Sequence, residues 1–144
     1  YSTYADSTTP EGISASRDHR AFCGFSMGSV ATRHTFQYCL DYFRYFLPSS
    51  GNLTSDGEYM ADIVQDSGHE WNDFFIFAAS GTDDFAYSAF KNQIEAMADV
   101  DDGTFRYADN ERQGNLYFLE QDGGVHSGEY AMEYFYNGLC WIWQ

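Results

Sequence analysis

The segment that most constrains the fold of this chain is Gly24-Phe25-Ser26-Met27-Gly28. A G-x-S-x-G segment places its serine in a strained turn between a strand and a helix, where the hydroxyl is exposed. An apolar run over residues 21–23 precedes the segment and a helical pattern follows it, as this turn requires. A serine is a weak nucleophile unless a base lies beside it. The sequence predicts that Ser26 is a nucleophile and that the Met27 N–H, at a helix N-terminus, stabilises an oxyanion. A glycine-rich turn with an incidental serine is the alternative.

A serine in such a turn acts with an acid and then a histidine that follow it in the chain. The apolar run over residues 75–79 leads directly to Asp83 and Asp84, where the acid is expected. We favour Asp84 for that role, although Asp83 remains open, since either aspartate could instead cap a turn or helix. Only His126 follows both the serine and the aspartates, in a glycine-rich loop. The three competing histidines are His19, His34 and His69.

Helix-like and strand-like segments alternate along the chain, which predicts α/β architecture. The 144 residues fit one domain, and we find no internal repeat or linker. Expected helices cover residues 12–20, 30–38, 57–66, 86–97 and 130–143. Expected strands cover residues 21–25, 41–47, 74–79, 105–108 and 116–119, with a turn at residues 48–51 between the second strand and the next helix.

The charge of the chain argues against two classes of partner. There are 22 acidic and 7 basic residues, for a net charge of −15. Nucleic acid and anionic membranes would therefore be repelled, whereas a neutral polysaccharide would not. Cys23, Cys39 and Cys140 lack zinc-site spacing, and either one disulfide, for example Cys39–Cys140, or three thiols could result. With no initiator Met or signal peptide, we expect a processed product, an excised piece or a fragment.

Several further motifs are distributed along nearly the whole chain. They are, in order, Tyr1-Ser2-Thr3-Tyr4-Ala5, Ser7-Thr8-Thr9-Pro10, Ala15-Ser16-Arg17, His19-Arg20, the Ser26 segment, Cys39-Leu40-Asp41-Tyr42, Phe77-Ala78-Ala79 with Gly81, Asp84 and Tyr87, Gln93-Ile94-Glu95-Ala96-Met97, Gly114-Asn115, Tyr117-Phe118-Leu119 and His126. In these motifs the chain resembles the feruloyl esterases of carbohydrate esterase family 1. The resemblance is strongest to the modules attached to xylanases in anaerobic cellulose-degrading bacteria and gut fungi.

The resemblance implies an α/β-hydrolase fold, a three-layer sandwich, of which residues 1–144 form the C-terminal portion from the elbow to the final helix. It implies a secreted enzyme with a Ser26–Asp84–His126 triad and no cofactor or metal. The reaction would be hydrolysis of the ester that joins ferulic or related hydroxycinnamic acids to the arabinose side chains of xylan. Two alternatives stay open. One is an acetylxylan esterase or general carboxylesterase. The other is a truncated, non-catalytic remnant that binds a carbohydrate or a partner, with sugars stacked on Trp71, Trp141 and Trp143. Core packing is the alternative role of these tryptophans, and we favour it for Trp141 and Trp143 on the final helix.

The chain departs from this family in two ways. The resemblance implies that the first strands of the sheet lie outside residues 1–144, together with a second oxyanion donor and the cover of an apolar sheet edge. We therefore expect the isolated chain to be a homo-oligomer, to bind a second chain at that edge, or to be poorly active. In addition, Ser29 and Ser127-Gly128 replace residues that border the cleft in the family, which predicts an altered acyl preference.

Overall fold

A sheet of four parallel strands in the order β1-β2-β3-β4 forms the centre of the protein. The computed structural model describes residues 7–52, 54 and 56–143, so residues 1–5 of the resemblance lie outside the described part. The strands are β1 (Ala21–Phe25), β2 (Tyr45–Ser49), β3 (Phe75–Gly81) and β4 (Leu116–Gln121). β2 and β3 are buried along their whole length, as parallel strands covered on both faces are.

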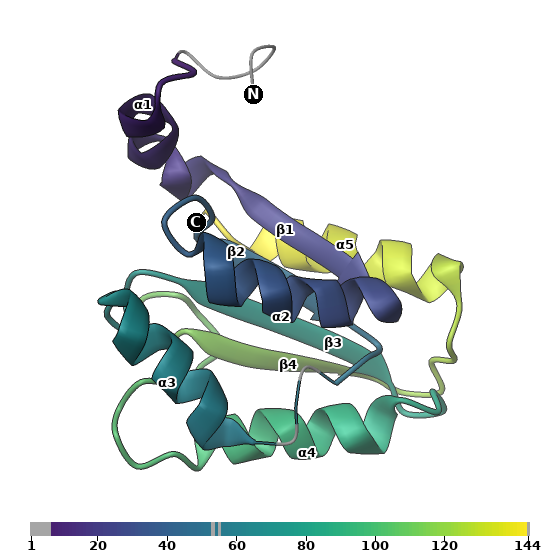
Figure 1. The fold of residues 1–144 in the computed structure, drawn as a ribbon. Helices are drawn as coiled ribbons and strands as arrows, with labels where there is room; N and C mark the ends of the chain where they lie inside the picture. The colour runs from purple at the N-terminus through teal and green to yellow at the C-terminus, as the bar shows by residue number, and fades with distance from the viewer. Residues whose placement is uncertain (1–6, 53, 55, 144) are drawn as a thin grey trace.

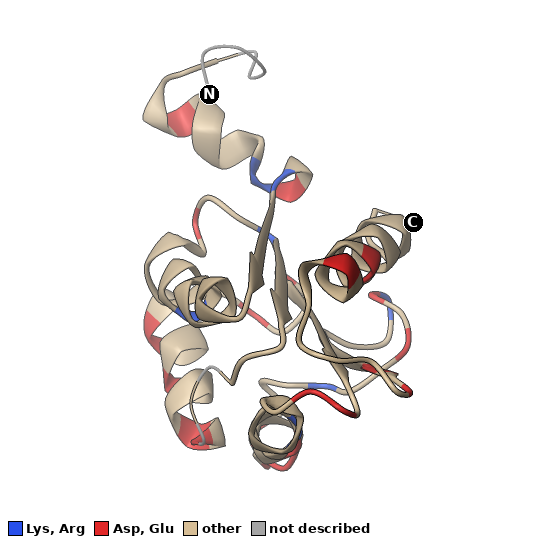
Figure 2. Ribbon diagram, turned by 90° about the vertical axis from the view of Figure 1, so that its right-hand side faces the viewer, with Lys and Arg blue, Asp and Glu red and all other residues tan. Residues whose placement is uncertain are grey.

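Helices cover both faces of this sheet, so the predicted α/β architecture with three layers is confirmed (Figure 1). The connections between successive strands run through α2 (Met27–Cys39), α3 (Gly57–Ser67) and α4 (Tyr87–Ala98). Because parallel crossovers are right-handed and the strands follow in order, all three helices lie on one face. α5 (Gly128–Trp141) follows β4 and lies on the other face, by itself near the C-terminus in Figure 2. Before β1 come α1 (Pro10–Ala15) and the short 3-10 helix η1 (Arg17–His19).

The alternation of side chains along the strands divides the core into two clusters. Phe46, Ile76 and Leu116 point toward α2, α3 and α4, where they pack with residues such as Phe90. Their strand neighbours Tyr45, Leu47, Phe75 and Phe77 point the other way and pack against Tyr134 of α5. Successive residues of a strand face opposite sides, so each strand contributes to both clusters.

Most predicted elements are found, but one helix and one strand in the N-terminal half differ from the prediction. The strand at residues 21–25 and the helices at 30–38, 57–66, 86–97 and 130–143 are found with shifted ends at most. The helix expected at 12–20 is divided, because the backbone leaves the helical conformation at Ser16 (φ −95°, ψ 11°), where α1 ends. The second strand begins at Tyr45 and includes Pro48, where we expected a turn. Its pairing with β3 is interrupted at residues 47 and 48, which accommodates a proline without an N–H.

The strand expected at residues 105–108 is wrong, since only an isolated bridge between Tyr107 and Leu116 is present. The buried side chain of Asn115 explains the difference. Its Oδ1 accepts from Arg106 N–H (2.8 Å) and its Nδ2 donates to Thr104 O (2.7 Å). A side chain therefore satisfies backbone groups that a strand would have paired with a ladder.

No disulfide joins Cys23, Cys39 and Cys140, so the Cys39–Cys140 bridge does not form. Burial raises the pKa of the Cys23 thiol, as expected for a core residue rather than a reactive one. Among residues 7–52, 54 and 56–143, no helix has both the length and the apolar composition to cross a membrane.

Candidate active site

Ser26 occupies the turn that joins β1 to α2, in the strand–turn–helix frame that the sequence predicts. Its backbone has φ 58° and ψ −115°, a region that residues other than glycine rarely adopt. A conformation of this kind costs about 1–3 kcal/mol and persists only where its surroundings enforce it. One such constraint is the hydrogen bond from Ser26 N–H to Ser49 O (2.9 Å) at the end of β2. The turn therefore holds the Ser26 hydroxyl at the C-terminal edge of the sheet.

Two glycines allow the turn to be this tight. A Cβ on Gly24 would overlap the carbonyl of Gly28, so β1 and α2 can cross only if residue 24 has no side chain. A Cβ on Gly51 would lie 2.7 Å from Ser26 O. Gly28, in contrast, has open space around it, so the second glycine of the motif is not required by packing. The sequence did not reveal Gly51, because its contact with Ser26 is between segments far apart in the chain.

The side chains of His126 and Asp84 continue from Ser26 in a single hydrogen-bonded line. His126 Nε2 lies 2.9 Å from Ser26 Oγ, and His126 Nδ1 lies 2.9 Å from Asp84 Oδ2 and 3.0 Å from Oδ1. An ionised carboxylate only accepts hydrogen bonds, so Nδ1 carries the proton and Nε2 accepts from the serine hydroxyl. This is the arrangement in which an imidazole can remove the serine proton.

The structure distinguishes the two candidate acids by burial. Asp84 is 6% exposed and meets His126, whereas Asp83 is exposed to solvent. The sequence left open that one aspartate caps while the other pairs with the histidine. Asp84 does both, because its Oδ1 also accepts from Ala86 N–H (2.8 Å). The second hydrogen bond fixes the carboxylate that faces the imidazole.

Backbone contacts between two loops bring Asp84 and His126 together. The loops follow the neighbouring strands β3 and β4, and their backbones bond directly, from Thr82 N–H to Gln121 O (2.9 Å) and from Asp83 N–H to Gly124 O (3.0 Å). The Gly123 N–H also donates to Thr82 Oγ1 (2.8 Å). Because adjacent parallel strands end at the same edge, residues 42 positions apart meet there.

Tyr134 of α5 lies next to one of these loops. Its side chain is buried, and its hydroxyl lies close to Gly124, two residues before His126. Burial, with a contribution from the negative charge of Asp84, raises the pKa of Tyr134 to about 12.

Met27 is the first residue of α2, directly after Ser26. The first N–H groups of a helix have no partner within the helix, and the helix dipole favours negative charge there. This position is suited to the oxyanion role predicted for the Met27 N–H.

The three residues expected to border the cleft, Ser29, Ser127 and Gly128, have structural roles. Ser29 is buried and its hydroxyl donates to Gly51 O (2.6 Å), which ties α2 to the loop after β2. Ser127 caps α5 by accepting from Tyr130 N–H (3.4 Å), and Gly128 begins that helix. The contacts of these residues are with other parts of the chain, and none of them supports the expected effect on acyl preference.

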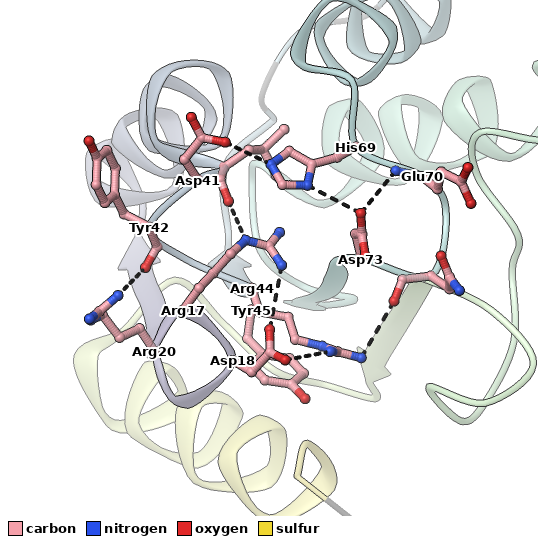
Figure 3. A network of polar contacts seen from close by, with 12 residues as sticks. Arg17, Asp18, Arg20, Asp41, Tyr42, Arg44, Tyr45, His69, Glu70 and Asp73 are labelled. Carbon is pink, nitrogen blue, oxygen red and sulfur yellow. Dashed lines mark hydrogen bonds and ion pairs between the residues drawn. The ribbon is translucent and has the colours of Figure 1, made fainter. Parts of the chain in front are cut away.

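The other three histidines lie away from Ser26. His19 is exposed at the end of η1, and His34 contacts the neighbouring Arg33. His69 lies between Asp41 (3.0 Å) and Asp73 (3.3 Å) in a polar network at the opposite end of the sheet (Figure 3). Within the described part of the chain, no group of three or more His, Cys, Asp or Glu side chains is placed to hold a metal ion.

The tryptophans have different environments. Trp141 packs on Phe75 and Tyr117 in the cluster under α5, as expected for a core residue. Trp143 is 46% exposed, so assigning it to the core is wrong, although its ring touches Tyr45. Trp71 has the Arg106 guanidinium over its ring, 3.9 Å from the centroid. None of these contacts involves the Ser26 site.

Apolar side chains that the sequence analysis did not consider surround the triad. Met27, Phe85 and Val125, each adjacent in sequence to a triad residue, are 85%, 82% and 46% exposed. The rings of Phe25 and Phe85 lie 4.6 Å and 4.3 Å from the imidazole of His126. Their positions next to the triad residues were the only signal that the sequence offered.

The parallel sheet, the elbow at Ser26 and the chain order serine, aspartate, histidine define an α/β-hydrolase fold. An S-formylglutathione hydrolase from Staphylococcus aureus shares this fold, with a TM-score of 0.65 and 17% identity over 87% of this chain and 51% of that protein. No protein-family model matches the chain.

Two other proteins are more similar to the chain than this hydrolase. A feruloyl esterase module from Clostridium thermocellum, solved in complex with sinapinate, has a TM-score of 0.89 and 41% identity, covering 98% of this chain. Endo-1,4-beta-xylanase Y from Acetivibrio thermocellus is 43% identical over an alignment of 145 residues that covers 96% of this chain. The predicted resemblance to a feruloyl esterase module of a xylanase is therefore confirmed. The chain spans 51% of that module and 13% of that xylanase.

Proposed function

We propose that this chain is a serine esterase that hydrolyses hydroxycinnamoyl esters, with feruloylated arabinoxylan as the natural substrate. The observation that carries the proposal is the hydrogen-bonded line from Ser26 through His126 to Asp84 at a strained elbow. The substrate class is supported by similarity to a module called a feruloyl esterase, whose bound sinapinate is a hydroxycinnamate. The net charge of −15 is compatible with a neutral polysaccharide.

The proposed mechanism is acyl transfer in two halves. His126 Nε2 takes the proton of Ser26 as Oγ attacks the ester carbonyl, and the Met27 N–H donates to the oxyanion that forms. Asp84 holds the imidazole through Nδ1 and stabilises its charged form. The protonated His126 then gives its proton to the departing sugar oxygen, which leaves an acyl group on Ser26. Water, deprotonated by His126, releases the hydroxycinnamic acid and restores the serine.

We further propose that residues 1–144 are the C-terminal portion of an α/β-hydrolase catalytic domain of carbohydrate esterase family 1. Secretion fits this proposal, since xylan is an extracellular polymer. β1 is an edge strand of the sheet that the described residues form, and another chain or a second copy could add a strand there. Light scattering of the isolated chain tests the assembly, and a monomer with full esterase activity would contradict it.

The test of the function is covalent labelling of Ser26 by an alkyl fluorophosphonate, together with turnover of methyl ferulate and of an acetyl ester. We expect labelling of the natural chain and a higher kcat/KM for the feruloyl ester. Ser26→Ala should lose the label and, where turnover is measurable, on the order of 10⁶ in rate. Ser14→Ala, at an exposed serine of α1, is the matched control. Unchanged turnover in Ser26→Ala would contradict the assignment of Ser26 as the nucleophile. A preference for the acetyl ester would contradict the assignment of a hydroxycinnamoyl group as the acyl half of the substrate.

A further inference from the structure

Phe85 combines strong exposure with a fixed position beside the triad. Its side chain is 82% exposed, yet its ring centroid lies 4.3 Å from that of His126, with 37° between the planes. Aromatic rings at this separation attract each other by about 0.5–1.5 kcal/mol beyond their area burial. The preceding residue, Asp84, is buried and bonded to the same imidazole, so the backbone beneath Phe85 is also held. One part of the ring is thus fixed on His126 while the rest faces solvent.

The proposed reaction determines which part of a substrate comes near the ring of Phe85. His126 Nε2 must donate a proton to the departing oxygen, so the two atoms approach within about 3 Å. The group attached to that oxygen therefore lies next to the imidazole. Phe25 and Phe85 both lie against this imidazole, but Phe25 is half-buried and Phe85 is 82% exposed. Phe85 is therefore the ring that the alcohol side of the ester can reach. Met27 N–H, in contrast, marks the position of the carbonyl oxygen.

We propose that Phe85 determines specificity for the alcohol half of the ester, by packing its exposed face on the sugar ring of the departing group. This inference rests on the proposed function and goes beyond it, because it names the residue that recognises the sugar. The C–H face of a sugar is apolar and packs on an aromatic face, with the area burial that drives other aromatic contacts. A methyl group on the departing oxygen is too small to cover the ring, so a methyl ester lacks this contact.

The test compares two esters of ferulic acid that differ only in the alcohol, methyl ferulate and feruloylated arabinose. We expect Phe85→Ala to lower kcat/KM for the sugar ester about five-fold and for the methyl ester less than about two-fold, which is the scale of one aromatic contact. Phe85→Tyr retains the aromatic face and should keep the natural ratio. Tyr38→Ala, at a 72% exposed aromatic residue of α2, is the matched control and should leave both values unchanged. Equal losses on the two esters, or no loss on either, would overturn the inference.

A binding measurement separates this inference from the proposed function. In Ser26→Ala protein, which cannot form the acyl-enzyme, calorimetry gives the Kd of each ester without turnover. Adding Phe85→Ala should raise the Kd of feruloylated arabinose about five-fold and leave that of methyl ferulate within about two-fold. If the natural chain hydrolyses neither ester, the proposed function fails, and the Kd values still decide the role of Phe85. If both Kd values stay unchanged, or if neither ester binds, the inference is rejected.

Discussion

Each end of the sheet holds a histidine that contacts an aspartate, but the group on the other side of the imidazole differs. At the C-terminal end, His126 lies between Asp84 (2.9 Å) and the hydroxyl of Ser26 (2.9 Å). At the N-terminal end, His69 lies between two carboxylates, Asp41 (3.0 Å) and Asp73 (3.3 Å). An imidazole between two acceptors is held in place, whereas one between an acceptor and a hydroxyl can move a proton. The aspartate–histidine pair alone therefore does not make a catalytic site.

The surroundings of the two histidines explain this difference. The N-terminal network joins the segments that precede β1, β2 and β3, and buried Arg17 extends it by donating to Leu40 O and pairing with Asp18 (Figure 3). Asp18 in turn pairs with Arg44 (3.2 Å). This network links three parts of the chain and contains no strained turn. The C-terminal site, in contrast, has Ser26 at φ 58°. The comparison predicts that changes at one end alter reactivity and at the other end alter stability.

Replacing each histidine with alanine should have the largest effect. His126→Ala removes the base, and we expect a loss on the order of 10⁶ in esterase rate, as for the serine itself. His69→Ala should leave the rate within about two-fold and lower the free energy of unfolding by about 1 kcal/mol, because it removes hydrogen-bonded contacts with Asp41 and Asp73. Fluorophosphonate labelling and urea unfolding measure the two properties. A large rate loss in His69→Ala would remove the distinction between the two ends.

The aspartates provide a second matched pair. Asp84→Asn keeps an oxygen that can accept from Ala86 N–H but no longer favours a proton on His126 Nδ1, so the rate should fall about 10⁴-fold. Asp73→Asn should leave the rate unchanged. Steady-state kinetics with methyl ferulate measures both variants. If Asp83→Asn caused the loss instead, the acid would be assigned to the wrong residue.

The elbow offers a test of the strained backbone itself. In Gly24→Ala the new Cβ would overlap the Gly28 carbonyl, so we expect a loss of about 1–3 kcal/mol in the free energy of unfolding. Gly28→Ala meets nothing within 4 Å and lies in a helix, where alanine is favoured by about 0.5–1 kcal/mol. Urea unfolding compares the two. Equal stabilities would show that β1 and α2 can separate at the turn.

The smallest expected effect is the response of the N-terminal network to acid. Burial raises the pKa of Asp73, but hydrogen bonds from Glu70 N–H and His69, with nearby positive charge, outweigh it and hold the pKa below its ordinary value. A lowered pKa stabilises the fold above about pH 4, and this contribution is lost as the pH falls through the folded-state pKa. Asp73→Asn should flatten the dependence of unfolding free energy on pH below about pH 4, by less than about 1 kcal/mol because the carboxylate is half exposed. Urea unfolding at several acidic pH values measures it, and an unchanged slope would place the acid response elsewhere.

Sequence reasoning succeeded where the signal is local and failed where a distant segment decides. The strand at residues 21–25 was predicted with its observed ends, because an apolar run stops at the Ser26 turn. Pro48 was assigned to a turn because proline lacks an N–H, yet β2 contains it where pairing with β3 is interrupted. Residues 105–108 have strand-like composition, but they do not form a strand. The Asn115 side chain hydrogen-bonds the backbone of Thr104 and Arg106 there.

For the candidate site, the sequence by itself determined the chemical groups and their order along the chain. Ser26 was marked by its glycine-rich segment, and His126 by its place after the aspartates. The tertiary structure alone decided that Asp84 rather than Asp83 faces the imidazole, and that Phe85 lies on it. It also decided that His69, although it pairs with two aspartates, lies at the far end of the sheet. The physical reason is that a local pattern specifies which groups a turn presents, whereas strand order and register specify which turns meet.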